Sequence, residues 1–200
     1  MSYTIRRMRE EDIPQVVEIE KIAFSRPWTK SVFKAALLLP YAAYYVAVED
    51  AGPEKDALQA GFEKDAAQAG PDQGAAQFLP DKDTARDGLD SGQSIPEKIV
   101  GMCGVKKIFE EGDISNVAVH PDYRGRGISR KMLEVLMREA REDGVQAFTL
   151  EVRAGNRIAV NLYESLGFCT EGVRPRFYEA PVEDGLIMWL RPQKEKSIYD

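Results

Sequence analysis

The segment NVAVHPDYRGRGISRKML, residues 116–133, contains the residue pattern that decides the fold of this chain. It passes from a β-like run, through a turn that contains proline, into the strongest helical pattern of the sequence. Apolar side chains recur there on one helix face and predict a helix over 129–143. These apolar positions are Met132, Leu133, Leu136, Met137 and Ala140. Gly144 supplies a stop for the helix, so the segment indicates a strand–turn–helix unit of an α/β domain.

The turn has the composition of an anion-binding site. Gly125 and Gly127 allow the backbone to approach a ligand closely, and the helix N-terminus adds unpaired N–H groups with a partial positive charge. Arg124, Arg126 and Arg130 add full charges. These features together suit a pyrophosphate, and a solvated connection is the alternative that the residues alone leave open. The turn is neither a Walker loop nor a GxGxxG loop.

The turn resembles the acetyl-CoA signature of the GNAT acetyltransferase superfamily, Gln/Arg-x-x-Gly-x-Gly/Ala. Arg124 fills the first position, Gly127 fills the glycine position, and Ser129 stands where the family usually has glycine or alanine. The resemblance implies that this loop holds the CoA pyrophosphate and that the preceding strand offers backbone groups to the pantetheine arm. The implied cofactor-binding residues are Val117, Ala118, Val119, Arg124, Gly125, Arg126, Gly127, Ile128, Ser129 and Arg130.

A second segment, LEVRAGNRIAVNLYESLGF (150–168), carries the candidate chemistry. From the residues alone, Glu151 is most simply a solvated carboxylate, Asn156 a helix N-cap and Tyr163 a half-buried aromatic. The segment is similar to the RimI-type pattern LEVRxxNxxAxxLYxxLGF, and Pro27–Trp28 and RPRFYEAPVEDGLIM (174–188) extend the similarity.

The RimI resemblance implies a role for each matching residue. Glu151 is then the proton acceptor, Tyr163 the proton donor, and Asn156 a contact of acetyl-CoA. Trp28 and Tyr178 resemble positions that line the peptide groove, although ordinary core or rim aromatics remain an equal alternative for each. The implied reaction is direct acetyl transfer, without a covalent intermediate, to the N-terminal alanine of ribosomal protein 18 of the small subunit.

The proton chemistry is consistent with an N-terminal acceptor. An α-amino group has a pKa of about 7.7–8.0, and the pKa of a lysine side chain is about 10.4. A fair fraction of α-amines is therefore neutral near pH 7, and a glutamate that acts through water is an adequate base. Two alternatives stay open: an acetyltransferase for a small-molecule amine or other protein N-termini, and a non-catalytic acyl-CoA-binding module.

The rest of the chain fits the α/β GNAT fold, with a mixed central sheet of about seven strands and about four helices. Outside the helix at 129–143, helices are expected from Asp12, as N-cap, to Ala23, from Thr29, as N-cap, to about Leu38, and over 157–166. The expected strands are Tyr3–Met8, Ala43–Val48, Ile99–Lys107, Gly112–Val119, Ala147–Val152, Phe168–Tyr178 and Leu186–Leu190. Residues 1–50 and 98–200 are thus expected to form one domain.

Residues 51–97 have a different composition and interrupt this domain between its second and third strands. Nine-residue units repeat there, as in EKDALQAGF (54–62) and EKDAAQAGP (63–71), with too few large apolar residues for a stacked core. We expect a disordered acidic insertion, with a short helix near 54–60 as the alternative. From Glu49 to Glu97 the chain has twelve acidic and four basic residues, so this stretch carries −8 and the remainder +2.

Composition limits the other function classes. A remainder of +2 is too weak a charge to indicate direct nucleic-acid binding. The sequence has no run of 18 apolar residues and begins without a signal-peptide pattern, so a soluble cytoplasmic protein without a membrane partner is expected. Cys103 and Cys169 lie in apolar stretches and are expected to be reduced core thiols. A single histidine, His120, and the absence of Cys/His spacing predict no metal site.

Overall fold

The computed structural model of this protein describes residues 2–50 and 97–192. Ser2–Glu49 and the chain from Lys98 onward form one compact unit, and the expected insertion lies outside the described residues apart from Glu97. Seven strands form one mixed sheet in the order β1-β2-β3-β4-β5-β7-β6. Their bounds are β1 Tyr3–Arg7, β2 Ala42–Glu49, β3 Lys98–Ile108, β4 Glu111–Val119, β5 Ala147–Arg153, β6 Cys169–Glu179 and β7 Val182–Leu190.

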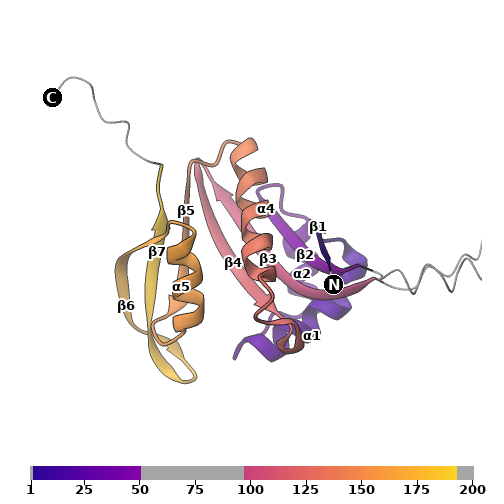
Figure 1. Cartoon of the computed structure of the whole chain (residues 1–200), viewed down its shortest axis with the longest axis horizontal. Coiled ribbons are helices and arrows are strands. Elements are labelled where there is room, and N and C mark those ends of the chain that lie inside the picture. The colour runs from indigo at the N-terminus through magenta and orange to yellow at the C-terminus, as the bar shows by residue number, and fades with distance from the viewer. Residues whose placement is uncertain (1, 51–96, 193–200) are drawn as a thin grey trace, which may run out of the picture. The chain divides into compact units, whose positions relative to one another are not determined.

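Helices cover both faces of the sheet (Figure 1). The helices of the described residues are α1 (Ile13–Ala23), α2 (Lys30–Leu37), α4 (Ile128–Glu142) and α5 (Arg157–Ser165), with short 3-10 turns η1 (Glu10–Asp12) and η2 (Pro121–Tyr123). The two faces have separate apolar cores. The helices α4 and α5 pack with Tyr45, Cys103 and Phe148, and α1 and α2 pack with Tyr44 and Met102. The expected mixed α/β fold of seven strands and four helices is confirmed.

Strand pairing places the end of β2 beside the start of β3. Adjacent strands in the sheet are antiparallel, apart from the parallel pair β4 and β5. Glu49, the last residue of β2, is paired with Lys98, the first residue of β3. The chain between them therefore connects two hydrogen-bonded neighbours, as the sequence predicted. A short turn is sufficient for such a connection.

One local expectation holds in position only, and another is wrong. Asp12 stands at the N-cap position of α1, as expected, but its side chain does not cap the helix, because its carboxylate accepts hydrogen bonds from Arg6 Nη1 at 2.7 Å, Arg6 Nη2 at 2.8 Å and Arg9 N at 2.7 Å. Cys103 is buried as expected, but Cys169 is exposed because it opens β6, the edge strand of the sheet. The cap expected at Thr29 is confirmed, since its Oγ1 accepts from Val32 N at 3.4 Å.

Candidate active site

The strands β4 and β5 pair over a short length and then separate. Their register runs from Glu111↔Ala147 to Asp113↔Thr149 and no further. The ribbons are close where they pair and diverge beyond that point (Figure 1). The separation begins next to a bulge in β4, where Asn116 has a φ of 53° and the register with β3 shifts. Beyond the bulge, the β4 edge at Val117–Val119 has no β5 partner within the described chain, so its backbone groups are available to a ligand.

The loop after β4 forms an open cradle at the N-terminus of α4. Gly125 and Gly127 have φ values of 74° and 75°, in the left-handed region that favours glycine. A Cβ built on either glycine would meet no atom within 4 Å, so both face open space. Gly127 is the N-cap of α4, without a side-chain cap. The first N–H groups of this helix are therefore left for a ligand, and the loop fits a pyrophosphate.

The arginines of the loop also bind the protein itself. Arg124 Nε donates to Val119 O at 3.1 Å, which closes the turn. Arg126 donates to the Tyr3 hydroxyl at 3.0 Å and to Asp122 O at 2.8 Å. Arg130 contacts the Ser165 hydroxyl of α5. All three guanidinium groups therefore have partners within the protein. Ile128 begins α4, and Ser129 follows inside the helix rather than capping it.

Glu151 lies on β5 and is held by an arginine from another strand. Its neighbours Leu150 and Val152 belong to the α4-side core, so Glu151 points to the face that carries α1 and α2. Arg174 Nη2 lies 3.2 Å from Glu151 Oε1. Arg174 is on β6, and β7 separates β6 from β5, so this side chain crosses one whole strand. The sequence indicated Glu151 but not its partner.

Tyr163 belongs to the apolar core on the α4 side of the sheet. It is buried on α5, 7 % exposed, with its ring 5.9 Å from that of Phe168. Burial raises the pKa of the Tyr163 hydroxyl, and the charges of Cys103 and Tyr178 act in the same direction. The hydroxyl therefore keeps its proton at neutral pH, as a proton donor must. Glu151 and Tyr163 thus come from opposite faces of the sheet.

The other predicted residues lie at the start of α5, on β6 and in the segment before α2. Asn156 Oδ1 accepts from Ala159 N at 3.2 Å, so Asn156 is the N-cap of α5. Arg153 stacks over the Tyr178 ring at 4.2 Å, and the charge of Glu151 contributes to raising the pKa of Tyr178, after burial. Trp28 packs at 5.3 Å from the ring of Phe33.

The segments that carry Trp28 and Tyr178 also meet. Arg26, which precedes Trp28, forms an ion pair with Glu179, which follows Tyr178. The two predicted groove residues are therefore carried by segments in direct contact with each other.

Sequence reasoning missed Glu20, a buried carboxyl that joins two parts of the site. Its Oε1 accepts from Asn116 Nδ2 at 2.9 Å and from Trp28 N at 3.2 Å. Glu20 thereby ties the bulge of β4 to the segment between α1 and α2. Burial raises its pKa, and the two hydrogen bonds oppose that rise. A signal was present, because Glu20 follows Val16 and Val17 by four and three residues on the apolar face of α1.

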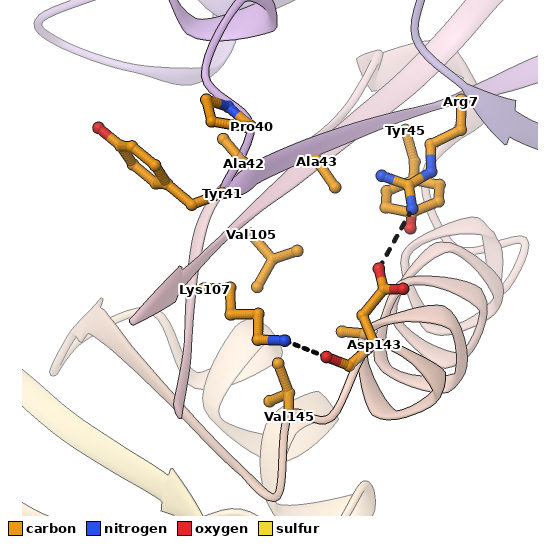
Figure 2. A pocket seen from close by; sticks show the side chains of 11 residues that line it. Arg7, Pro40, Tyr41, Ala42, Ala43, Tyr45, Val105, Lys107, Asp143 and Val145 are labelled. Carbon is orange, nitrogen blue, oxygen red and sulfur yellow. Dashed lines mark hydrogen bonds and ion pairs between the residues drawn. The ribbon is translucent and has the colours of Figure 1, made fainter. Parts of the chain in front are cut away.

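A cavity of about 200 Å³ lies elsewhere, at the C-terminal end of α4 (Figure 2). The charged side chains at its rim have partners at the rim itself. Arg7 Nη2 is 4.0 Å from the carboxylate of Asp143, and Lys107 donates to the carbonyl of Asp143. It contains none of the predicted site residues. Within the described residues, no group of three or more potential ligands could hold a metal, and no helix is long and apolar enough to cross a membrane.

A mixed sheet that opens at one parallel strand pair, with a glycine-containing loop and a helix N-terminus beside the opening, is the arrangement expected of an acetyl-CoA-dependent N-acetyltransferase. Comparison with known proteins agrees with this class. The model of the acetyltransferase (GNAT) family matches residues 61–168, more than half of the chain. The chain belongs to the GNAT acetyltransferase family.

Curated relatives and a solved structure extend the comparison. A Bacillus subtilis protein named "Putative ribosomal protein bS18-alanine N-acetyltransferase" is 30% identical over 186 residues, 93% of each chain. The Escherichia coli ribosomal protein bS18-alanine N-acetyltransferase is 40% identical over 95 residues, which are 46% of this chain and 64% of that protein. The crystal structure of the E. coli ribosomal-protein-S18-alanine N-acetyltransferase superposes with a TM-score of 0.67 at 24% identity, covering 100% of both chains, and shows the shared fold.

Proposed function

We propose that this enzyme transfers the acetyl group of acetyl-CoA to the α-amine of the N-terminal alanine of ribosomal protein bS18. The observation that carries the proposal is the separation of β4 and β5, together with Glu151 and Tyr163 on opposite faces of the sheet. The names of the B. subtilis and E. coli relatives support the acceptor. A ribosomal-protein acceptor also implies that the enzyme works in the cytoplasm.

The loop and the free edge of β4 are proposed to hold acetyl-CoA. Backbone amides from Arg124 to Arg130 bind the pyrophosphate at the N-terminus of α4, where the open space at Gly125 and Gly127 admits it. The unpaired edge at Val117–Val119 hydrogen-bonds the pantetheine arm. Asn156 contacts the same ligand from the start of α5. When bound there, acetyl-CoA supplies the thioester carbonyl that the amine attacks.

The protein's own groups then move two protons. Glu151 accepts the proton of the amine, directly or through a water molecule. Tyr163, which burial keeps protonated, donates a proton to the departing sulfur. Backbone N–H groups beside Val117 stabilise the negative charge that develops on the carbonyl oxygen. Neither Cys103 nor Cys169 is needed, because the amine takes the acetyl group directly.

The test compares acceptors rather than variants. A peptide that begins with alanine is expected to be acetylated at its α-amine, much faster than an N-blocked peptide that contains lysine. Mass spectrometry locates the acetyl group on the peptide. Small amines are tested as further acceptors, and the release of free CoA measures their acetylation. Faster modification of lysine side chains or of small amines would refute the acceptor assignment. No CoA release with any acceptor would indicate a binding module instead.

A further inference from the structure

Four charged residues lie on the face that carries α1 and α2, on four of the five neighbouring strands from β3 to β6. They are Lys106 on β3, Asp113 on β4, Glu151 on β5 and Arg174 on β6. Lys106 is the register partner of Asp113, and Asp113 is the partner of Thr149. Glu151 lies two residues beyond Thr149 on the same face, a diagonal separation that side chains of this length can span. The two carboxylates are therefore neighbours at the point where β4 and β5 part.

Asp113 differs from Glu151 in having no counter-ion at contact distance. Among the described residues, no basic group lies within 4 Å of Asp113, whereas Arg174 pairs with Glu151. Burial raises the pKa of Asp113, and the charge of Glu151 raises it further, while Lys106 and Arg174 lower it. A half-buried carboxylate beside a second one is electrostatically costly unless a cation joins them.

A buried hydroxyl without a partner independently marks the same place. Tyr44 is 2 % exposed, and its hydroxyl forms no hydrogen bond within the described chain. Its ring lies over Gly104, where a Cβ would come within 2.4 Å of it, and Gly104 separates Tyr44 from Ser115 of β4 in the sheet. The ring thus reaches toward β4. Burial raises the pKa of Tyr44 to about 12, and the charge of Asp113 contributes to that rise.

The Ser115 hydroxyl is likewise buried without a partner. Two carboxylates and two buried hydroxyls without hydrogen-bond partners therefore belong to neighbouring positions on one face of the sheet. A primary ammonium offers three N–H donors and one positive charge. Its charge offsets the repulsion between the carboxylates, and its three donors can be shared between Glu151 and Asp113.

We propose that Asp113 is a second acceptor-binding carboxylate, which together with Glu151 binds the acceptor amine in its protonated form. The inference rests on the proposed function, because it concerns the amine of that acceptor. The ligand class is the primary ammonium of a chain end. Glu151 then removes a proton from an amine that the site has already captured, so the enzyme does not depend on the neutral fraction in solution.

The test measures peptide binding to the CoA-saturated enzyme by calorimetry at pH 6.5, where an α-amine is mostly protonated. The probes are a peptide that begins with alanine and its analogue with a hydroxyl in place of the α-amine. The wild type is expected to prefer the ammonium peptide. Asp113→Asn should weaken binding of that peptide about tenfold, the size typical of a lost charged hydrogen bond, and leave binding of the hydroxyl peptide unchanged.

Matched variants separate a charge effect from a structural one. Asp113→Glu retains the charge and should keep most of the preference, and Glu111→Gln, two residues earlier on β4, should leave it within about twofold. An equal loss for both peptides, or no loss for either, would overturn the inference. Acetylation of the alanine peptide by the wild type is measured first. If the wild type does not acetylate the peptide, the proposed function is refuted. If it does, and Asp113→Asn still prefers the ammonium peptide as the wild type does, only the role of Asp113 is refuted.

Discussion

Replacement of Gly127 by alanine tests whether the α4 N-terminus binds acetyl-CoA. Gly127 has a φ of 75°, and an alanine there must adopt the left-handed region at a cost of about 1–2 kcal/mol. No protein atom lies within 4 Å of the new Cβ, so the structure imposes no additional clash. For a domain of this size, the melting temperature should fall by about 2–4 °C per kcal/mol. The variant is therefore expected to stay folded.

The expected effect on the ligand is much larger. If the pyrophosphate binds the loop amides, the Cβ would occupy the open space through which it must approach them. Each hydrogen bond from an amide to a charged group is worth about 1.5–3 kcal/mol. Loss of two such bonds weakens acetyl-CoA binding by at least about 100-fold. Valine in place of alanine should be worse in both respects, because its β-branched side chain restricts the backbone further.

A glycine at the other end of the same helix provides the control. Gly144 has a φ of 90°, and a Cβ there would meet only Lys107 Nζ, at 3.6 Å. Gly144→Ala should therefore lose about as much stability as Gly127→Ala and keep its affinity for acetyl-CoA. Thermal melting gives the stability and calorimetry gives the affinity. Equal affinity in the two folded variants would refute the assignment of the pyrophosphate site.

Three further predictions concern the base, the buried carboxyl and the insertion. Glu151→Gln should lower kcat far more than it lowers affinity for acetyl-CoA, measured by steady-state kinetics and calorimetry, and wild-type turnover in this variant would rule out the base. Burial raises the pKa of Glu20, so the wild type loses stability as pH rises through that raised value. Glu20→Gln should therefore melt at a higher temperature than the wild type at pH 7 and lose this advantage below about pH 4.5. A difference in melting temperature that stays constant across pH would contradict the raised pKa of Glu20 as its cause. A short Gly/Ser linker in place of residues 51–97 should preserve folding and peptide acetylation, because Glu49 and Lys98 are paired neighbours; unfolding would show that the segment packs on the domain. Activity kept on a peptide and lost on the intact acceptor protein would identify the insertion as a docking segment.

Local patterns predicted most of the fold because they act over a few residues. The apolar spacing of Met132, Leu136 and Ala140 requires a helix with one buried face, and that helix is observed at Ile128–Glu142. The glycines of the loop were expected to let the backbone approach a ligand, and both adopt the left-handed backbone that other residues adopt only at a cost. The roles of Glu151 and Tyr163 came from family resemblance, and they stay predictions.

Some local expectations failed where a distant residue competed for the same group. Asp12 has the right type and position for an N-cap, but the guanidinium of Arg6 on β1 binds its carboxylate instead. Cys169 stands in an apolar stretch, yet it is exposed because β6 has a neighbour on one side only. Neither fact is contained in the spacing of neighbouring residues.

The sequence by itself determined the elements, their order and the loop that fits a pyrophosphate, because side-chain periodicity and glycine conformation are local properties. Only the tertiary structure decided which groups meet at the separation of β4 and β5. Arg174 reaches Glu151 across β7, Glu20 of α1 binds Asn116 of β4, and Asp113 lies beside Glu151. These contacts join residues on different elements, and their electrostatic energies depend on distance and burial that chain spacing does not specify.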